Sequence, residues 1–310
     1  VYMSLAIGIF IGAFMFTGFN FLGAIDTMFD IMSNKVGGNV NILVFLVLLG
    51  IIVSAIQKSG ASQAYGNYAA RKINGKRSAL LVTFFLGLLI FIDDYFNCLT
   101  VGSVMRPITD QHNVSRAKLA YLIDATAAPV CIIAPISSWA AAVSGFVPGE
   151  DGMSVFVRAI PYNYYALLTI VMMVSMVLMK EEFGAMGVHE SNALKGDLFT
   201  TAARPYASGE GDGPVNPRGK VMDLLIPIIS LVICCVIGMI YTGGFFSGTD
   251  FVTAFSQSDA SVGLVLGSFF GLVITILLYM VRRVLSFRDC MACIPEGIKS
   301  MVPALSLIHI

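Results

Sequence analysis

The sequence predicts an all-α, polytopic membrane protein, and its composition is the first observation behind this prediction. Of the 310 residues, 57% are hydrophobic and only 12% are charged, whereas about 25% of the residues in an ordinary soluble domain are charged. The chain therefore has too little polar surface to cover a globule in water. Its 19 Lys and Arg residues balance its 19 Asp and Glu residues, and this zero net charge argues against a nucleic-acid partner.

Long apolar segments are the second observation. Seven of them lie at about 3–24, 40–57, 78–105, 117–146, 162–179, 222–243 and 260–281. Most are close to the roughly 20 residues that a helix needs to cross a bilayer. The third and fourth are too long for one crossing and have polar residues in the middle, and the fourth contains Pro129 and Pro135, which remove helical hydrogen bonds. We expect a re-entrant hairpin at about 78–105 and a broken helix at about 117–146.

Loop charges are the third observation, and they also favour the hairpin. The connection from 58 to 77 has basic residues but no acid, so the positive-inside rule places it in the cytoplasm. If every apolar segment crossed once, the basic loop at 282–288 would lie outside and the acidic loop at 244–259 would lie inside. A hairpin at 78–105 that enters and leaves on the cytoplasmic side reverses both assignments.

A polar stretch at 180–221 divides the chain into two membrane halves. It contains Gly209-Glu-Gly-Asp-Gly-Pro214 and Pro217, a composition typical of a linker, and we expect it to be cytoplasmic. The first half then covers residues 1–179 and the second half covers residues 222–310. Two halves with broken helices favour an inverted-repeat transporter, although no repeat in the sequence is strong enough to prove one.

The first candidate site lies inside the predicted hairpin. Asp93, Asp94 and Asn97 are surrounded by apolar or small residues, so they are expected to face a polar cavity or to bind a cation. Helical spacing keeps Asp93, Asn97 and Thr100 close to one face, where they offer the oxygen ligands that a sodium ion or proton needs. The alternative interpretation is a juxtamembrane acidic pair at a helix end.

The second candidate site lies in the predicted broken helix. It combines one carboxylate with three hydroxyl groups near the two prolines: Asp124, Thr126, Ser137 and Ser138. Carbonyls freed by the prolines are further cation ligands. Each hydroxyl alone is explained equally well by a hydrogen bond to a neighbouring carbonyl, and an interfacial anchor or packing role is favoured for Trp139. We expect both sites to converge near mid-membrane, where Asp94 or Asp124 alternates between a proton and sodium.

Several motifs in residues 78–146 resemble the signature region of the NhaC-type sodium/proton antiporter family. They are Asp93-Asp94-Tyr95, Val101-Gly-Ser-Val-Met-Arg-Pro107, Thr109-Asp110, Ser115-Arg-Ala-Lys-Leu-Ala-Tyr121, Asp124-Ala-Thr-Ala-Ala-Pro129 and Ala134-Pro-Ile-Ser-Ser-Trp139. That family belongs to the ion transporter superfamily, whose members pair inverted repeats that each contain a re-entrant hairpin and a broken helix. The resemblance implies secondary active transport across a prokaryotic inner membrane, with sodium and protons as transported ions, membrane lipid as surroundings and no cofactor.

The resemblance leaves the substrate and the assembly open. The family also contains exchangers of organic acids such as malate and lactate, so a small carboxylate coupled to protons or sodium is the alternative substrate, and a homodimer is a further open partner. Family members have a second hairpin and broken helix in the C-terminal half. This chain stops shortly after Glu296-Gly-Ile-Lys-Ser-Met-Val-Pro303, where that hairpin would begin, so we expect a truncated chain with an incomplete second repeat.

Two other classes of membrane protein were weighed against a carrier. An intramembrane aspartyl protease would use two carboxylates that share a proton and activate water. Its expected GxGD motif occurs at Gly209–Asp212, but in the polar linker, and Asp93 and Asp94 are adjacent rather than on separate helices. Transport is therefore favoured over an enzyme. A channel is the other alternative, which flux saturation or exchange stoichiometry would separate from a carrier.

Overall fold

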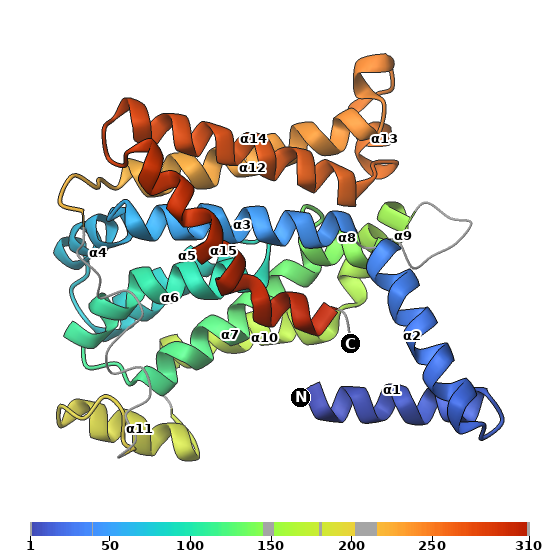
Figure 1. Cartoon of the computed structure of the whole chain (residues 1–310). Helices are drawn as coiled ribbons and strands as arrows, with labels where there is room; N and C mark the ends of the chain where they lie inside the picture. Colours follow the sequence, from blue (N-terminus) through green and yellow to red (C-terminus); the bar gives the residue numbers. More distant parts are fainter. Residues whose placement is uncertain (1, 39, 145–151, 180–181, 202–215, 309–310) are drawn as a thin grey trace.

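The chain folds into helices joined by short connections (Figure 1). The computed structural model describes residues 2–38, 40–144, 152–179, 182–201 and 216–308. Its helices are α1 (Tyr2–Phe16), α2 (Phe21–Gly38), α3 (Val40–Lys58), α4 (Ala61–Lys72), α5 (Lys76–Leu89), α6 (Asp94–Gln111), α7 (Arg116–Ile133), α8 (Ser138–Ser144), α9 (Gly152–Ala159), α10 (Tyr164–Met179), α11 (Ala185–Leu194), α12 (Met222–Thr242), α13 (Phe251–Ser256), α14 (Ala260–Val281) and α15 (Phe287–Ile308). No strand occurs in these ranges, which confirms the all-α prediction.

Several of these helices are suited to a membrane. Within the described ranges, α3, α12 and α14 are each long and apolar enough to cross a bilayer, and the bent pairs α1–α2 and α9–α10 pass the same test when each pair is taken together. The chain therefore has three such spans, or up to five if each bent pair is one span. This number of apolar helices supports the expected multi-pass membrane protein.

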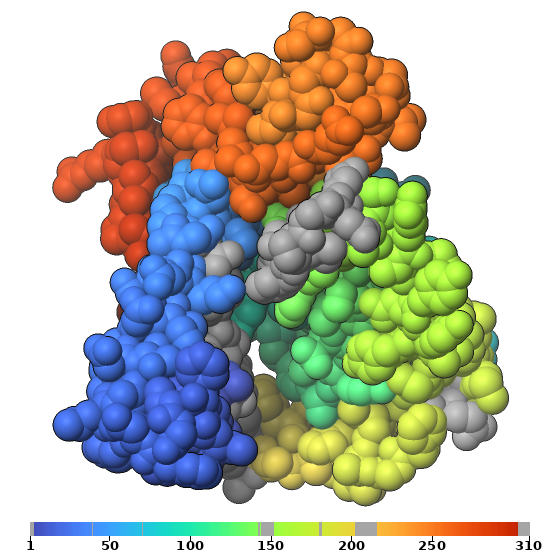
Figure 2. Space-filling model, turned by 90° about the vertical axis from the view of Figure 1, so that its right-hand side faces the viewer, coloured from blue at the N-terminus to red at the C-terminus, as the bar shows by residue number. Residues whose placement is uncertain are grey.

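The first apolar segment is not the single helix expected at 3–24. α1 and α2 meet at an angle of 118°, because Gly18 and Phe19 both have positive φ angles, of 65° and 67°. The Oδ1 atom of Asn20 accepts a hydrogen bond of 3.1 Å from the Gly23 amide and so caps the start of α2. Figure 1 shows α1 and α2 projecting from the other helices, and in Figure 2 a hollow separates them from the green helices.

Helices α12 and α14 pack closely because α14 presents glycines to its neighbour (Figure 1). Gly263, Gly267 and Gly271 recur every four residues along α14 and all face α12. A Cβ atom at Gly267 would meet the backbone of Cys235 at a separation that real Cβ atoms essentially never show. Small residues allow the close backbone approach from which helix association in a membrane gains its packing energy.

Helix α15 crosses α3 in the same way, with Gly297 against Gly50. The Ser54 hydroxyl of α3 donates a 2.9 Å hydrogen bond to the Glu296 carboxylate, and Lys58 forms an ion pair with Glu296 at 3.3 Å. α15 runs as one helix through Glu296–Pro303. The described residues therefore contain a single helix where a second hairpin was expected to begin.

The two overlong apolar segments are both interrupted. The first leaves the helical conformation between Leu89 and Asp94, and the second between Ile133 and Ser138. Of the two prolines in the second segment, Pro129 lies inside α7 and does not end it. The interruption comes at Ala134, which is extended with φ −82° and ψ 122°, because the following Pro135 disfavours helical dihedrals at the residue before it.

The polar stretch at 180–221 contains a helix, α11, that contacts the first half of the chain. The Glu190 carboxylate accepts a 2.8 Å hydrogen bond from the Ser115 amide and forms an ion pair with Lys76. Glu182 forms a second ion pair, of 2.7 Å, with the buried Lys118. The GxGD motif at Gly209–Asp212, on which the protease alternative partly depends, lies outside the described residues.

We predict that Gly267→Ala will destabilise the protein by about 1–3 kcal/mol, because the added methyl group must displace the α12 backbone. Thermal unfolding in detergent micelles measures this effect. Gly12→Ala on α1 is the matched control, since a Cβ atom there meets nothing within 4 Å, and alanine is the better helix former. Equal thermal midpoints for the two variants would contradict the close α12–α14 contact.

Candidate functional site

The two interruptions lie against each other, where the connection between α5 and α6 meets the connection between α7 and α8. The Ser138 amide donates a 2.8 Å hydrogen bond to the Ile92 carbonyl. The Ser138 hydroxyl donates another, also of 2.8 Å, to Oδ2 of Asp93. Asp93 is 2% exposed and Ser138 is 8% exposed, so both bonds are shielded from solvent. We call this contact between residues 90–94 and residues 134–139 the junction.

Asp93 caps helix α6 from inside the protein. Its Oδ1 accepts a 2.9 Å hydrogen bond from the Phe96 amide, and its backbone is extended, as N-cap residues usually are. Since Oδ2 accepts from Ser138, both carboxylate oxygens have partners. This role resembles the helix-end interpretation raised by the sequence, except that the helix end is buried.

Asn97 and Thr100 provide oxygen atoms one and two turns further along α6. The Nδ2 group of Asn97 donates 2.7 Å hydrogen bonds to the carbonyls of Gly87 and Ile90 and so ties α6 to the end of α5. Its Oδ1 atom and the Oγ1 atom of Thr100 are buried, and neither has a hydrogen-bond partner in the described part of the chain. Two buried oxygen atoms are thus left available to a ligand.

Asp94 of the junction and Asp124 of α7 are the other two carboxylates of the candidate sites. Asp94 is half-buried and interacts electrostatically with Asp124 of α7, which is exposed. The Asp94 carboxylate also accepts a hydrogen bond from the Trp139 side chain. Cys98, one turn after Asp94, lies within electrostatic range of all three aspartates. The acids of the two candidate sites are thus coupled electrostatically.

The remaining hydroxyl groups are bonded within their own segment. Thr126 donates a 2.6 Å hydrogen bond to the Leu122 carbonyl, and Ser137 donates to the carbonyls of Cys131 and Ala134 at 2.7 and 2.8 Å. Both hydroxyls thus form the hydrogen bonds to neighbouring carbonyls that the sequence allowed as the alternative interpretation. Their oxygen lone pairs can still accept a hydrogen bond or coordinate a cation.

Gly87 connects Thr126 to the hairpin. A Cβ atom at Gly87 would lie 3.2 Å from the Thr126 methyl group and 3.6 Å from Oδ1 of Asn97. The free amide oxygen therefore lies where α5, α6 and α7 meet. Gly87 was not predicted as a site residue, because a lone glycine within an apolar run gives no local signal of the helix that it faces.

Cys98 and Trp139 also lie at this site, although Cys98 was given no role from the sequence and Trp139 was expected to be an interfacial anchor or a packing residue. The i, i+4 spacing of Asp94 and Cys98 was a usable signal, because such residues share a helix face. The contact between Trp139 and Asp94 joins different segments and has no local signal. No group of three or more His, Cys, Asp or Glu side chains in the described ranges could hold a metal ion, so a cation here would depend on amide, hydroxyl and carbonyl oxygens besides carboxylates.

The chain is similar to known proteins over most of its length. A model of the Na+/H+ antiporter family matches residues 149–310, which lie after the 78–146 region that carries the NhaC-type motifs. A protein of Haemophilus influenzae, described only as uncharacterized, is 32% identical over 328 aligned positions, covering 99% of this chain and 61% of the relative. The chain thus spans less than two thirds of that relative's length. No solved structure matches it.

We predict that Asn97→Ala will lower stability by about 1–3 kcal/mol, because two buried carbonyls at the end of α5 lose their donor. The thermal midpoint in detergent reports the loss. Ser103→Ala on the same helix is the control, since that hydroxyl bonds only to the Thr100 carbonyl in its own turn. If both variants unfolded at the same temperature as the unmodified protein, the tie between α5 and α6 would be unimportant.

Proposed function

The chain belongs to the Na+/H+ antiporter family, and from this premise we propose that it exchanges sodium ions for protons across a prokaryotic inner membrane. The family is one of transporters and not of enzymes, which disfavours the intramembrane protease alternative. We further propose that the chain is of the NhaC type, on the motifs in residues 78–146.

The junction is the observation that carries this proposal. Its Asp93 and Asp94 carboxylates lie at the start of α6, the helix that also carries the unpartnered oxygens of Asn97 and Thr100, in a protein whose long helices suit a membrane. Such oxygens are the ligands of a hard cation. We propose that the ion lies between the hairpin turn and the helix break, with Thr126, Ser137 and Ser138 lining the site.

Asp94 and Asp124 are the proposed exchange groups. Asp93 already uses both oxygens to cap α6 and to bind Ser138, whereas Asp94 and Asp124 interact with each other. A cation bound near these two carboxylates would offset their negative charge. Competition of sodium and a proton for one negative charge couples the two ions without a separate relay.

The ends of the α5–α6 segment support the re-entrant proposal. Lys76 begins α5, and Ser115 follows the end of α6, yet both contact the same residue, Glu190 of α11. A segment whose two ends meet one side chain is expected to enter and leave on one side of the membrane. The basic residues near these ends favour the cytoplasmic side.

Organic-acid exchange is the weaker candidate. A carboxylate substrate needs a cationic group, and the charged groups that act on Asp93 and Asp94 are other aspartates. The junction therefore favours a cation as the transported species. Transport of a small carboxylate and assembly into a homodimer stay predictions.

We predict that Asp94→Asn or Asp124→Asn will reduce sodium-dependent proton flux at least tenfold, because the amide cannot alternate between a proton and sodium. The full-length protein in proteoliposomes with an internal pH-sensitive dye gives this rate. Asp30→Asn on α2 is the control, because Asp30 is exposed and lies outside the junction. Normal exchange by the double variant Asp94→Asn/Asp124→Asn would overturn the mechanism and favour organic-acid exchange with structural aspartates.

We also predict that cysteines placed at Ser78 and at Arg106, in a background without the native cysteines, will react with an impermeant thiol reagent from the same side of the membrane. The two positions lie near the two ends of the hairpin. Inside-out and right-side-out vesicles provide the comparison. Labelling from opposite sides would mean that residues 78–105 cross the membrane once.

A further inference from the structure

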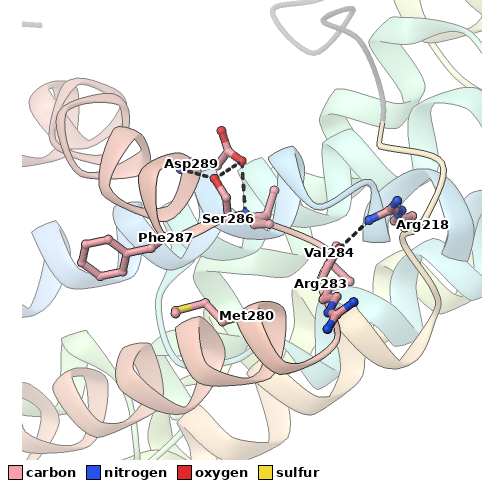
Figure 3. Close-up of a pocket in the computed structure, with 8 residues that line it drawn as sticks. Arg218, Met280, Arg283, Val284, Ser286, Phe287 and Asp289 are labelled. Atoms are coloured by element: carbon pink, nitrogen blue, oxygen red, sulfur yellow. Dashed lines mark hydrogen bonds between the residues drawn. The ribbon is translucent and has the colours of Figure 1, made fainter.

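A cavity of about 430 Å³ lies at the turn between α14 and α15, far along the chain from the junction residues (Figure 3). Two arginines contribute to its wall, Arg218 from the segment before α12 and Arg283 from the turn itself. Met280 and Phe287 add apolar surface. The cavity is of the size that small ligands occupy.

Arg283 has a backbone conformation that favours glycine. Its φ angle is 53°, and it ends α14 in a Schellman motif, with the Val284 amide bonded to the Tyr279 carbonyl at 2.9 Å and its own amide bonded to the Met280 carbonyl at 3.0 Å. Glycine is the usual residue at this position because any side chain there is strained. The strained turn holds the Arg283 side chain at the wall of the cavity.

Hydrogen bonds bring Arg218 to the same turn. Its Nη1 atom donates a 3.2 Å bond to the Arg283 carbonyl, and the Asn216 side chain donates to the Val284 carbonyl. In the described part of the chain, neither Arg218 nor Arg283 makes an ion pair, whereas the neighbouring Arg282 pairs with Asp223. Two cationic side chains thus share one cavity without a fixed counterion.

Asp289 is the one acid among the described residues that line the cavity, and its carboxylate is engaged elsewhere. Asp289 accepts hydrogen bonds from the Ser286 amide at 3.1 Å and from the Ser286 hydroxyl at 2.6 Å, and its own amide bonds back to that hydroxyl. This capping box uses the carboxylate at the start of α15 and keeps the pKa of Asp289 below its ordinary value. The arginines are therefore free to bind another anion.

The position of the cavity identifies the kind of anion. It adjoins the last residue of α14, a helix long and apolar enough to cross a membrane, and Val281 and Phe287 are 81% and 58% exposed. The basic turn is expected on the cytoplasmic side, where the leaflet carries anionic lipids. Cationic and exposed apolar groups side by side match a phosphate attached to acyl chains.

We propose that Arg218 and Arg283 bind the phosphate of an anionic phospholipid in this cavity, with its acyl chains against Met280 and Phe287. The site does not depend on which ion the protein exchanges. Inorganic phosphate shares the headgroup chemistry but lacks the acyl chains. Competition with inorganic phosphate therefore distinguishes a bound lipid from a bound free anion.

Native mass spectrometry of the full-length protein, titrated with phosphatidylglycerol or with phosphatidylcholine of the same acyl chains, tests the proposal. We expect preferential binding of phosphatidylglycerol, and about a fivefold loss of that affinity in Arg218→Gln and in Arg283→Gly, since each basic residue near an anionic surface contributes about that factor. Arg71→Gln, an exposed arginine of α4 outside the cavity, should bind as the unmodified protein does.

The thermal midpoint separates a lost site from a lost fold. Arg283→Gly should unfold at the same or a higher temperature, because glycine relieves the strain at φ 53°. Equal binding of the two lipids, or unchanged phosphatidylglycerol binding in both cavity variants, would overturn the proposal. Full displacement of the lipid by excess inorganic phosphate would show that the ligand is a free anion instead.

Discussion

The buried carboxylate of Asp93 is the group on which the arrangement of the two interrupted segments depends. A charged oxygen removed from water must be hydrogen-bonded, and Asp93 meets this requirement with one bond to the first turn of α6 and one to the Ser138 hydroxyl of α8. The hairpin turn and the helix break are therefore held at the same point.

A second set of charged contacts holds these segments at the opposite end of the helices. Glu190, which pairs with Lys76, is 3% exposed, and Lys118, which pairs with Glu182, is 2% exposed. Removing one partner of either pair would leave an uncompensated buried charge. Through Glu190, helix α11 ties the start of α5 to the residue before α7. The contacts of α11 thus hold the ends of the helices that flank the junction.

The sequence predicted where the long segments are interrupted better than it predicted what the interruptions contact. Polar residues and Pro135 marked two breaks, because neither suits a continuous helix facing lipid. The bend at Gly18 and Phe19 was missed, since a phenylalanine at positive φ has no local signal. The bond between Asp93 and Ser138 spans 45 residues, and such a pairing depends on helix packing that no local pattern specifies.

Proton release on sodium binding is the most direct test of whether the junction exchanges one ion for the other. Calorimetric titration of the full-length protein with sodium, in two buffers of different ionisation enthalpy, counts the protons released for each sodium ion bound. Our account predicts the release of up to one proton for each bound sodium ion, because the two ions compete for one negative charge. Sodium binding without proton release, across the range in which buried carboxylates titrate, would contradict it.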